Sequence, residues 1–189
     1  MSYCNNTLAR GTRRLKVYVN GFDAFDSPNY PVLVSAGINI TVTGQHRSAL
    51  EGSQLTVSPV QAQPISLIHL YPGIAADVIQ NILQQPVKAL ILLSYGVGNA
   101  PQSPQLLAPL KYAKENNIVV LNCTQCGRGK VDMQGYANGQ TLAEIGVVSG
   151  ADMTPEAALA KLHYLFSKDL NYDQIRTELE RDMCGELSN

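Results

Sequence analysis

Three short apolar segments, each linked to the next by a helical pattern, constrain the fold of this chain most strongly. They are residues 65–71, 88–94 and 118–122. The middle segment is apolar at nearly every position, as in a strand that is buried on both faces of a sheet. Strands that alternate with helices at this spacing form β-α-β units. The sequence therefore predicts an α/β fold with a parallel sheet, in which residues 144–148 are the candidate fourth strand.

The predicted helices carry recognisable start signals. Residues 75–83 repeat apolar side chains with helical periodicity. Ser103-Pro104 and Thr154-Pro155 place an N-cap residue before a proline at the first helical position. Asn171 and Gln174 resemble a capping box at the start of the last helix. Together with the parallel sheet, these helices predict a three-layer domain.

The first third of the chain lacks this regularity. Residues 3–8 and 14–19 have the composition of two strands around a turn, whereas residues 22–50 read as loop. An isolated hairpin is barely stable in water, and so long a structureless segment is uncommon in a compact domain. We therefore expect the strands to belong to a sheet completed outside this sequence. The expected parts are a remnant of a catalytic domain (1–20), an interdomain linker (21–61) and a C-terminal α/β domain (62–189).

Composition and charge exclude several classes of function. Only 15% of residues are charged and the net charge is −1, whereas an average soluble domain is ~25% charged. Such a chain provides no electrostatic field for a nucleic-acid backbone. Its longest apolar run, residues 89–93, is far shorter than the ~20 residues of a membrane span. The N-terminus has no signal-peptide pattern. We therefore expect a cytoplasmic protein that binds neither nucleic acid nor membrane.

The cysteines and histidines form no recognisable metal-binding or catalytic motif. Cys123 and Cys126 have the spacing of a zinc or redox pair, but a structural zinc site needs a second ligand pair. A thiol near a ligand loop is the favoured interpretation, and a redox or metal role is the weaker alternative. His69 and His163 fall within a predicted strand and helix, where packing histidines are common. The sequence thus predicts neither a metal nor a cofactor.

In an open parallel sheet, ligands bind beyond the carboxyl ends of the strands. The loops at these ends are residues 71–73, 94–101, 123–130 and 150–154. Gly96-Val97-Gly98 lacks the third glycine of a dinucleotide fingerprint. Composition and spacing therefore predict a ligand crevice without specifying its ligand.

These loops resemble those of the bacterial cytoplasmic (type I) L-asparaginases. The similar segments, in order along the chain, are residues 21–29, 71–73, 95–101, 124–126, 150–157, 161–164 and 185–187. They correspond to the C-terminal half of such an enzyme and the last strands of its N-terminal domain. The resemblance implies hydrolysis of L-asparagine to L-aspartate and ammonia without metal or cofactor, by a homo-oligomer (dimer or tetramer).

The resemblance also implies a catalytic residue. The family uses a nucleophilic threonine in a Gly-Gly-Thr motif, and a lysine that hydrogen-bonds into a Thr-Asp pair; Lys16 matches that lysine. A threonine hydroxyl needs a base, and a lysine of lowered pKa can serve in such a relay. This sequence contains neither motif, and Leu15 stands where the family usually has threonine. Because loss of a nucleophile costs on the order of 10⁶ in rate, we expect the chain alone to be inactive, with the missing N-terminal half as its partner.

A second, regulatory site is implied by the same resemblance. Residues that would bind asparagine or aspartate there, as effector or substrate, are Asn99, Thr124, Gln125 and Cys126. Tyr136 lies where the family reaches a neighbouring subunit. The family commonly has an arginine that grips the ligand carboxylate, but Leu93 occupies that position and cannot replace the contact.

Two alternatives to a catalytic role remain open from the sequence. In the first, the chain is a non-catalytic module, derived from an asparaginase, that binds asparagine or aspartate or mediates oligomerisation. In the second, it is a decayed fragment. In the latter case an exposed strand edge in residues 1–20 would promote aggregation.

Overall fold

A parallel four-stranded sheet organises the second part of the chain. The computed structural model describes residues 1–44, 46–48, 52, 54, 56–84, 86–135 and 137–188. The sheet has the strand order β10-β9-β8-β7. Its strands are β7 (Ile65–His69), β8 (Ala89–Ser94), β9 (Val119–Thr124) and β10 (Val148–Ser149). Every residue of β8 and β9 is buried, because helices cover both faces of the sheet.

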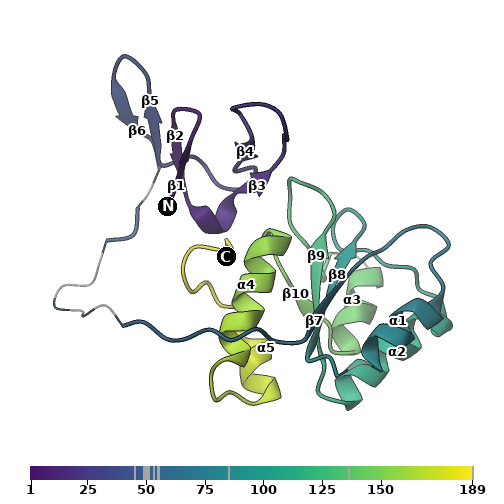
Figure 1. The fold of residues 1–189 in the computed structure, drawn as a ribbon. Coiled ribbons are helices and arrows are strands. Elements are labelled where there is room, and N and C mark those ends of the chain that lie inside the picture. The colour runs from purple at the N-terminus through teal and green to yellow at the C-terminus, as the bar shows by residue number, and fades with distance from the viewer. Residues whose placement is uncertain are drawn as a thin grey trace.

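The helices divide into two layers, one on each side of the sheet (Figure 1). One layer holds α1 (Ala76–Leu83), α2 (Pro104–Glu115) and α3 (Ala137–Glu144); the other holds α4 (Pro155–Phe166) and α5 (Tyr172–Glu180). Leu90 and Leu92 of β8 face the first layer, and Ile91 between them faces the second. This alternation is the period of two that a strand imposes. The predicted three-layer α/β architecture is confirmed.

The start signals of the helices act as predicted. The Ser103 side chain accepts a hydrogen bond from the Leu106 N–H at 3.3 Å. The Thr154 side chain accepts one from the Ala157 N–H at 3.1 Å. The predicted capping box of α5 is also present. These contacts satisfy backbone donors that the first turn of a helix leaves without partners.

The connection between β9 and β10 differs from the prediction. Residues 137–144 form α3, which the sequence analysis did not predict, and the strand expected at residues 144–148 is only Val148–Ser149. Gly139 explains part of this error, because glycine lowers helix propensity. Its position in α3 is tightly packed, since a Cβ there would lie 2.7 Å from the Met133 Cα.

The N-terminal segment has shorter strands than predicted. A hairpin joins β1 (Ser2–Cys4) to β2 (Thr7–Ala9). Its turn consists of Asn5 and Asn6, both with positive φ (45° and 57°), so the single strand predicted over residues 3–8 is wrong. Asparagine tolerates this conformation, which two-residue hairpin turns require. The second predicted strand, residues 14–19, is confirmed only over β3 (Leu15–Lys16), which follows the 3₁₀ turn η1 (Gly11–Arg13).

The prediction of a continuous loop over residues 22–50 is also wrong in part. β4 (Phe25–Asp26) pairs with β3, and β5 (Val34–Ala36) pairs with both β2 and β6 (Ile40–Val42). β2 therefore has a partner within this chain, β5, while β1 and β6 form the two edges of this sheet. The expectation that further strands of the sheet lie outside this sequence stays a prediction. Strands of two or three residues are too short to show a period of two. The boundaries of the expected remnant and linker remain predictions.

A buried ion pair joins α4 to the C-terminal segment. Lys161 Nζ lies 2.7 Å from Glu186 Oε1, and both side chains are at least 96% buried (4% and 2% exposed). The ammonium also donates to the backbone carbonyls of Leu179 and Arg181, at 2.9 and 2.5 Å. Glu186 in turn accepts a hydrogen bond from the Cys184 N–H at 2.7 Å. Such partners are what a buried charge needs.

This pair predicts a specific loss of stability in acid. Burial by itself raises the pKa of Glu186, but Lys161 and the N–H groups of Cys184 and Met183 outweigh burial and lower that pKa from 4.5 to about 2. The carboxylate therefore stabilises the fold above about pH 4.5, and this contribution is lost as the pH falls through about 2. The loss amounts to roughly 3 kcal/mol.

Urea unfolding at a series of pH values checks this expectation. The urea midpoint should fall between pH 4.5 and 2. Glu186→Gln should flatten that fall, because the amide does not titrate in this range. An equally steep fall in Glu186→Gln would contradict the assignment.

Candidate functional site

The loops that follow β8 and β9 are joined by side-chain hydrogen bonds at the carboxyl end of the sheet. Thr124 Oγ1 donates to the Gly96 carbonyl at 2.5 Å and accepts from the Cys126 N–H at 3.0 Å. Asn122 Nδ2 donates to the Gly98 carbonyl at 3.0 Å. Gly98 is required here: its φ is 106°, and a Cβ would lie 2.7 Å from Val131 Cγ1. The two loops therefore form one surface.

The predicted ligand-binding residues lie in these two loops. Gln125 Nε2 donates to the carbonyls of Leu70 and Leu93, at 2.6 and 2.8 Å, and so holds the ends of β7 and β8 together. Asn99 closes the loop after β8 through backbone hydrogen bonds with Tyr95, at 2.8 and 2.9 Å. Its side chain is half-buried and Cys126 is exposed. In this arrangement Thr124 and Gln125 shape the loops through hydrogen bonds, and the ligand-binding role expected of Asn99 and Cys126 stays a prediction.

Leu93 and Tyr136 were predicted to belong to two different sites, the effector site and a neighbouring subunit's active site. Leu93 is buried in the apolar cluster shared with α4 and α5. An apolar side chain in that position offers no hydrogen bond to a carboxylate. Tyr136, the predicted intersubunit residue, lies outside the described residues.

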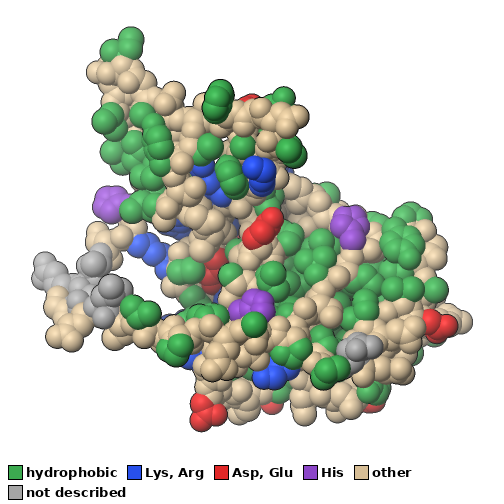
Figure 2. All heavy atoms as spheres, in the orientation of Figure 1, with side chains coloured by type: hydrophobic (Ala, Val, Ile, Leu, Met, Phe, Trp, Pro, Cys, Tyr) green, Lys and Arg blue, Asp and Glu red, His purple; other side chains and the backbone are tan. Residues whose placement is uncertain are grey.

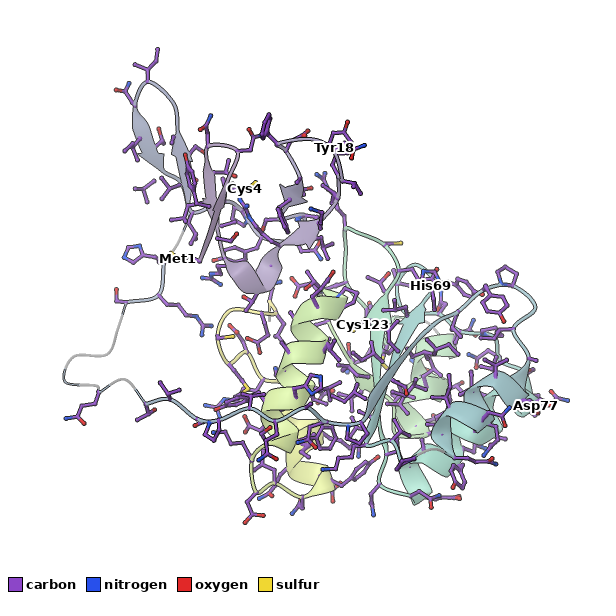
Figure 3. The ribbon with its side chains drawn as sticks, in the orientation of Figure 1. Met1, Cys4, Tyr18, His69, Asp77 and Cys123 are labelled. Atoms are coloured by element: carbon purple, nitrogen blue, oxygen red, sulfur yellow. The ribbon has the colours of Figure 1, made fainter. Side chains whose placement is uncertain are left out.

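The two cysteines of the Cys-x-x-Cys pattern have different environments. Cys123 is buried in the sheet (Figure 3), and burial raises its thiol pKa to about 12. A thiol with so high a pKa is a poor nucleophile and metal ligand, because the thiolate is the reactive form. This disfavours the redox alternative. Over the described ranges, no three His, Cys, Asp or Glu side chains are grouped as metal ligands.

Lys16 lies on the small β3–β4 sheet, above the carboxyl end of the parallel strands in Figure 1. It pairs with Phe25 of β4, and its Nζ lies 5.2 Å from the centre of the Phe25 ring. The side chain is exposed, so its ammonium is available to a group that approaches from outside the chain.

Asn29 connects the β3–β4 sheet to the loops at the carboxyl end. Its Nδ2 donates to the carbonyls of Gly129 and Asp152, at 2.9 and 3.2 Å, and its Oδ1 accepts from the Gly129 N–H at 2.9 Å. Asp26 of β4 also lies 3.6 Å from Arg128, in an exposed ion pair. Sequence reasoning placed Asn29 in a family-like segment but gave it no role. A short polar side chain after a proline was its only local signal.

Arg13 is a second residue that sequence reasoning missed. It is 1% exposed, which is rare for an arginine without a partner. Its Nη1 lies 2.8 Å from Asp152 Oδ2, and its Nε donates to the Gly185 carbonyl at 2.7 Å. The pair joins η1 to the loop after β10, across most of the sequence.

None of the helices in the described part of the chain is long and apolar enough to cross a membrane.

Comparison with known proteins identifies the family to which this chain belongs. Residues 64–179 match the family model of the Glutaminase/Asparaginase C-terminal domain. The chain is 51% identical over 186 residues to L-asparaginase 1 of Escherichia coli K12, a match that covers 98% of this chain and 55% of the relative. It is 39% identical to the human 60 kDa lysophospholipase, over 98% of this chain and 33% of that protein.

Solved structures agree with these sequence matches. The crystal structure of L-asparaginase I from Vibrio cholerae is similar with a TM-score of 0.94 and 50% identity, over 99% of this chain and 57% of that one. The chain thus spans about half the length of the asparaginases that it matches. It belongs to the glutaminase/asparaginase family, as the loops predicted, and carries that family's C-terminal domain.

Proposed function

We propose that this chain supplies the C-terminal half of an L-asparaginase and acts together with an N-terminal half that carries the nucleophilic threonine. The observation that supports this most is that the similarity to L-asparaginase 1 covers 98% of the chain. It therefore includes the strand that carries Lys16 as well as the α/β domain. A cytoplasmic location and a homo-oligomeric state (dimer or tetramer) are further parts of this proposal, and both rest on the family resemblance.

In the proposed reaction, each half of the enzyme contributes some of the catalytic groups. A threonine hydroxyl of the N-terminal half attacks the side-chain amide carbon of L-asparagine, and ammonia leaves with a proton from the relay. Water then hydrolyses the resulting ester to L-aspartate. Lys16 assists by moving a proton to and from the hydroxyl through the Thr-Asp pair, as general acid-base groups do.

An exposed apolar surface on the N-terminal segment supports association with another polypeptide. Apolar side chains are exposed over this part of the molecule in Figure 2, and Tyr18 lies on the loop that follows β3 in Figure 3. Its exposed apolar side chains include Tyr3, Val17, Val19, Phe22, Ile38, Ile40 and Val42. Exposed apolar side chains beside open strand edges favour protein association. We assign this surface to the N-terminal half.

Mixing experiments test the proposal. We expect the chain to co-elute in size-exclusion chromatography with a separately expressed N-terminal half of E. coli L-asparaginase 1, and the mixture to release ammonia from L-asparagine. Ile40→Asp changes a side chain that is 76% exposed, so it should weaken association and leave the fold of the chain unchanged. Association without ammonia release would overturn the catalytic proposal.

The second candidate function is a non-catalytic asparagine- or aspartate-binding module. The observation that favours it is that the loops after β8 and β9 are already joined by hydrogen bonds within this chain. Calorimetry of the chain alone with millimolar asparagine and aspartate tests it. Heat of binding, together with an inactive mixture, would favour this function over catalysis.

A further inference from the structure

The small sheet that carries Lys16 is attached to the α/β domain through polar contacts, and two of these, from Arg13 and Asn29, reach Asp152. We propose that Arg13 and Asp152 are positioning residues, which fix the place of Lys16 relative to the carboxyl end of the parallel sheet. This inference rests on the proposed function, because it assigns the pair a role in the reaction that Lys16 assists.

Arg13 forms the connection on the side of β3. Its guanidinium donates hydrogen bonds from two nitrogens, Nε to the Gly185 carbonyl at 2.7 Å and Nη2 to Ser188 Oγ at 2.9 Å. Its third nitrogen, Nη1, lies 2.8 Å from Asp152 Oδ2 in an ion pair. One face of the guanidinium lies 5.3 Å from the centre of the Tyr30 ring. A planar group held in several directions has a defined orientation. Arg13 ends η1, three residues before Lys16, so little chain separates the fixed group from the lysine.

Asp152 forms the connection to both strands of the small sheet. Its carboxylate, 9% exposed, pairs with Arg13 on one oxygen and accepts the Ser188 N–H at 2.7 Å on the other. Its backbone carbonyl accepts from Asn29, which follows β4. A single residue in the loop after β10, Asp152, therefore holds β3 through Arg13 and the segment after β4 through Asn29.

The backbone before Asp152 adopts a conformation that is rare for its residue type. Ala151 has a φ of 49°, in the left-handed region that disfavours residues with a Cβ. Two hydrogen bonds hold it: its N–H donates to Ser149 Oγ at 3.1 Å, and its carbonyl accepts the Val131 N–H at 2.9 Å. Such conformations persist where the surroundings determine them and cluster at functional sites. Here the conformation places Asp152 against Arg13.

A positioning role makes a distinct prediction for the kinetics. Lys16 assists proton transfer in the proposed reaction, so its displacement should slow the chemical step. A displacement of about 1 Å can cost about 100-fold in rate. Substrate binding would change little, because Lys16 is not assigned a contact to the bound amino acid in its ground state.

The variant Asp152→Asn tests this role with the full chain assembled with the N-terminal half of E. coli L-asparaginase 1. Asparagine keeps the shape of the side chain and can still accept the Ser188 N–H, but it removes the charge that pairs with Arg13. We expect kcat to fall about 100-fold with KM changed less than about twofold. Asp173→Asn is the matched control, because it removes an 86% exposed carboxylate from the Asp173–Arg176 pair of α5. It should change neither constant.

Hydrogen–deuterium exchange of the chain alone provides a readout that is independent of activity. The Val17 N–H donates to the Ala24 carbonyl at 2.9 Å and so reports on the β3–β4 sheet directly beside Lys16. In Asp152→Asn its exchange should accelerate at least about tenfold, while exchange in β8 stays unchanged. Equal acceleration in both sheets would show a general loss of stability and would overturn the proposal.

The two readouts separate the two proposals. Unchanged Val17 exchange, or accelerated exchange with an unchanged kcat, would overturn the positioning role. Local acceleration of exchange in a chain whose wild-type mixture releases no ammonia would support the anchoring by Asp152 and overturn the proposed function instead.

Discussion

Replacing Lys16 by methionine is expected to lower the kcat of the assembled asparaginase by about 10²–10⁴-fold, the range that a general acid-base group contributes. Methionine keeps an unbranched apolar side chain next to the Phe25 ring but removes the ammonium. Because Lys16 is exposed, the unfolding midpoint of the chain should stay unchanged. Ammonia release by equal amounts of assembled protein measures the effect.

Lys168→Met is the matched control for this variant. Lys168 also places its Nζ near an aromatic ring, 4.6 Å from the centre of Tyr164, but it follows α4 and belongs to no proposed site. Its replacement should leave kcat unchanged. If both variants lose activity equally, or if Lys16→Met retains it, the role assigned to Lys16 is wrong.

Replacing Lys161 by methionine is expected to destabilise the chain by about 3–5 kcal/mol, as when one partner of a buried ion pair is removed. The variant leaves the Glu186 carboxylate buried without its cation, and the carbonyls of Leu179 and Arg181 without their donor. Urea unfolding at neutral pH measures the change. Protonation of Glu186 would relieve part of the cost, so the destabilisation should be smaller near pH 4 than at pH 7.

Two further variants test this explanation. Lys161→Met combined with Glu186→Gln should recover part of the lost stability, because the buried charge is then absent. Arg181→Met removes one partner of an exposed ion pair, Arg181–Glu178, and should cost less than about 1 kcal/mol. A double variant less stable than Lys161→Met would contradict the view that the uncompensated carboxylate causes the loss.

The parallel sheet could be predicted because its signals are local. Residues 89–93 and 118–121 are apolar throughout, and the structure buries every residue of β8 and β9. The helix starts at Ser103 and Thr154 depend on side-chain contacts within one turn, which sequence shows directly. α3 was missed because it contains three weak helix formers, Asn138, Gly139 and Thr141, and its apolar stripe is short.

The strands of the N-terminal segment could not be predicted, because their signals are not local. Its strands have two or three residues each, which is too few for an alternating pattern to be recognised. The Asn5-Asn6 turn was a readable signal, since two asparagines tolerate the positive φ of a hairpin turn. The pairing of β2 with β5 depends on contacts between residues about 27 positions apart, which no local pattern indicates.

The sequence predicted the loops of the candidate site, but it did not predict the contacts that connect Lys16 to them. Parallel topology places the loops after β8 and β9 at one edge, and Asn99 and Cys126 lie there as expected. The contacts of Arg13 reach a carbonyl 172 residues away, and those of Asn29 reach residues 100 and 123 positions away. A single sequence contains no sign of such pairs, so the attachment of Lys16 to the domain became apparent only in three dimensions.

Ammonia release from L-asparagine shows whether this chain and an N-terminal half form one enzyme. It should be measured for the purified 189-residue chain alone, and again after addition of the N-terminal half of E. coli L-asparaginase 1. We expect no release by the chain alone and steady turnover in the mixture, which Lys16→Met lowers by about 10²–10⁴-fold. Turnover by the chain alone, at a rate that the added half does not change, would contradict this expectation.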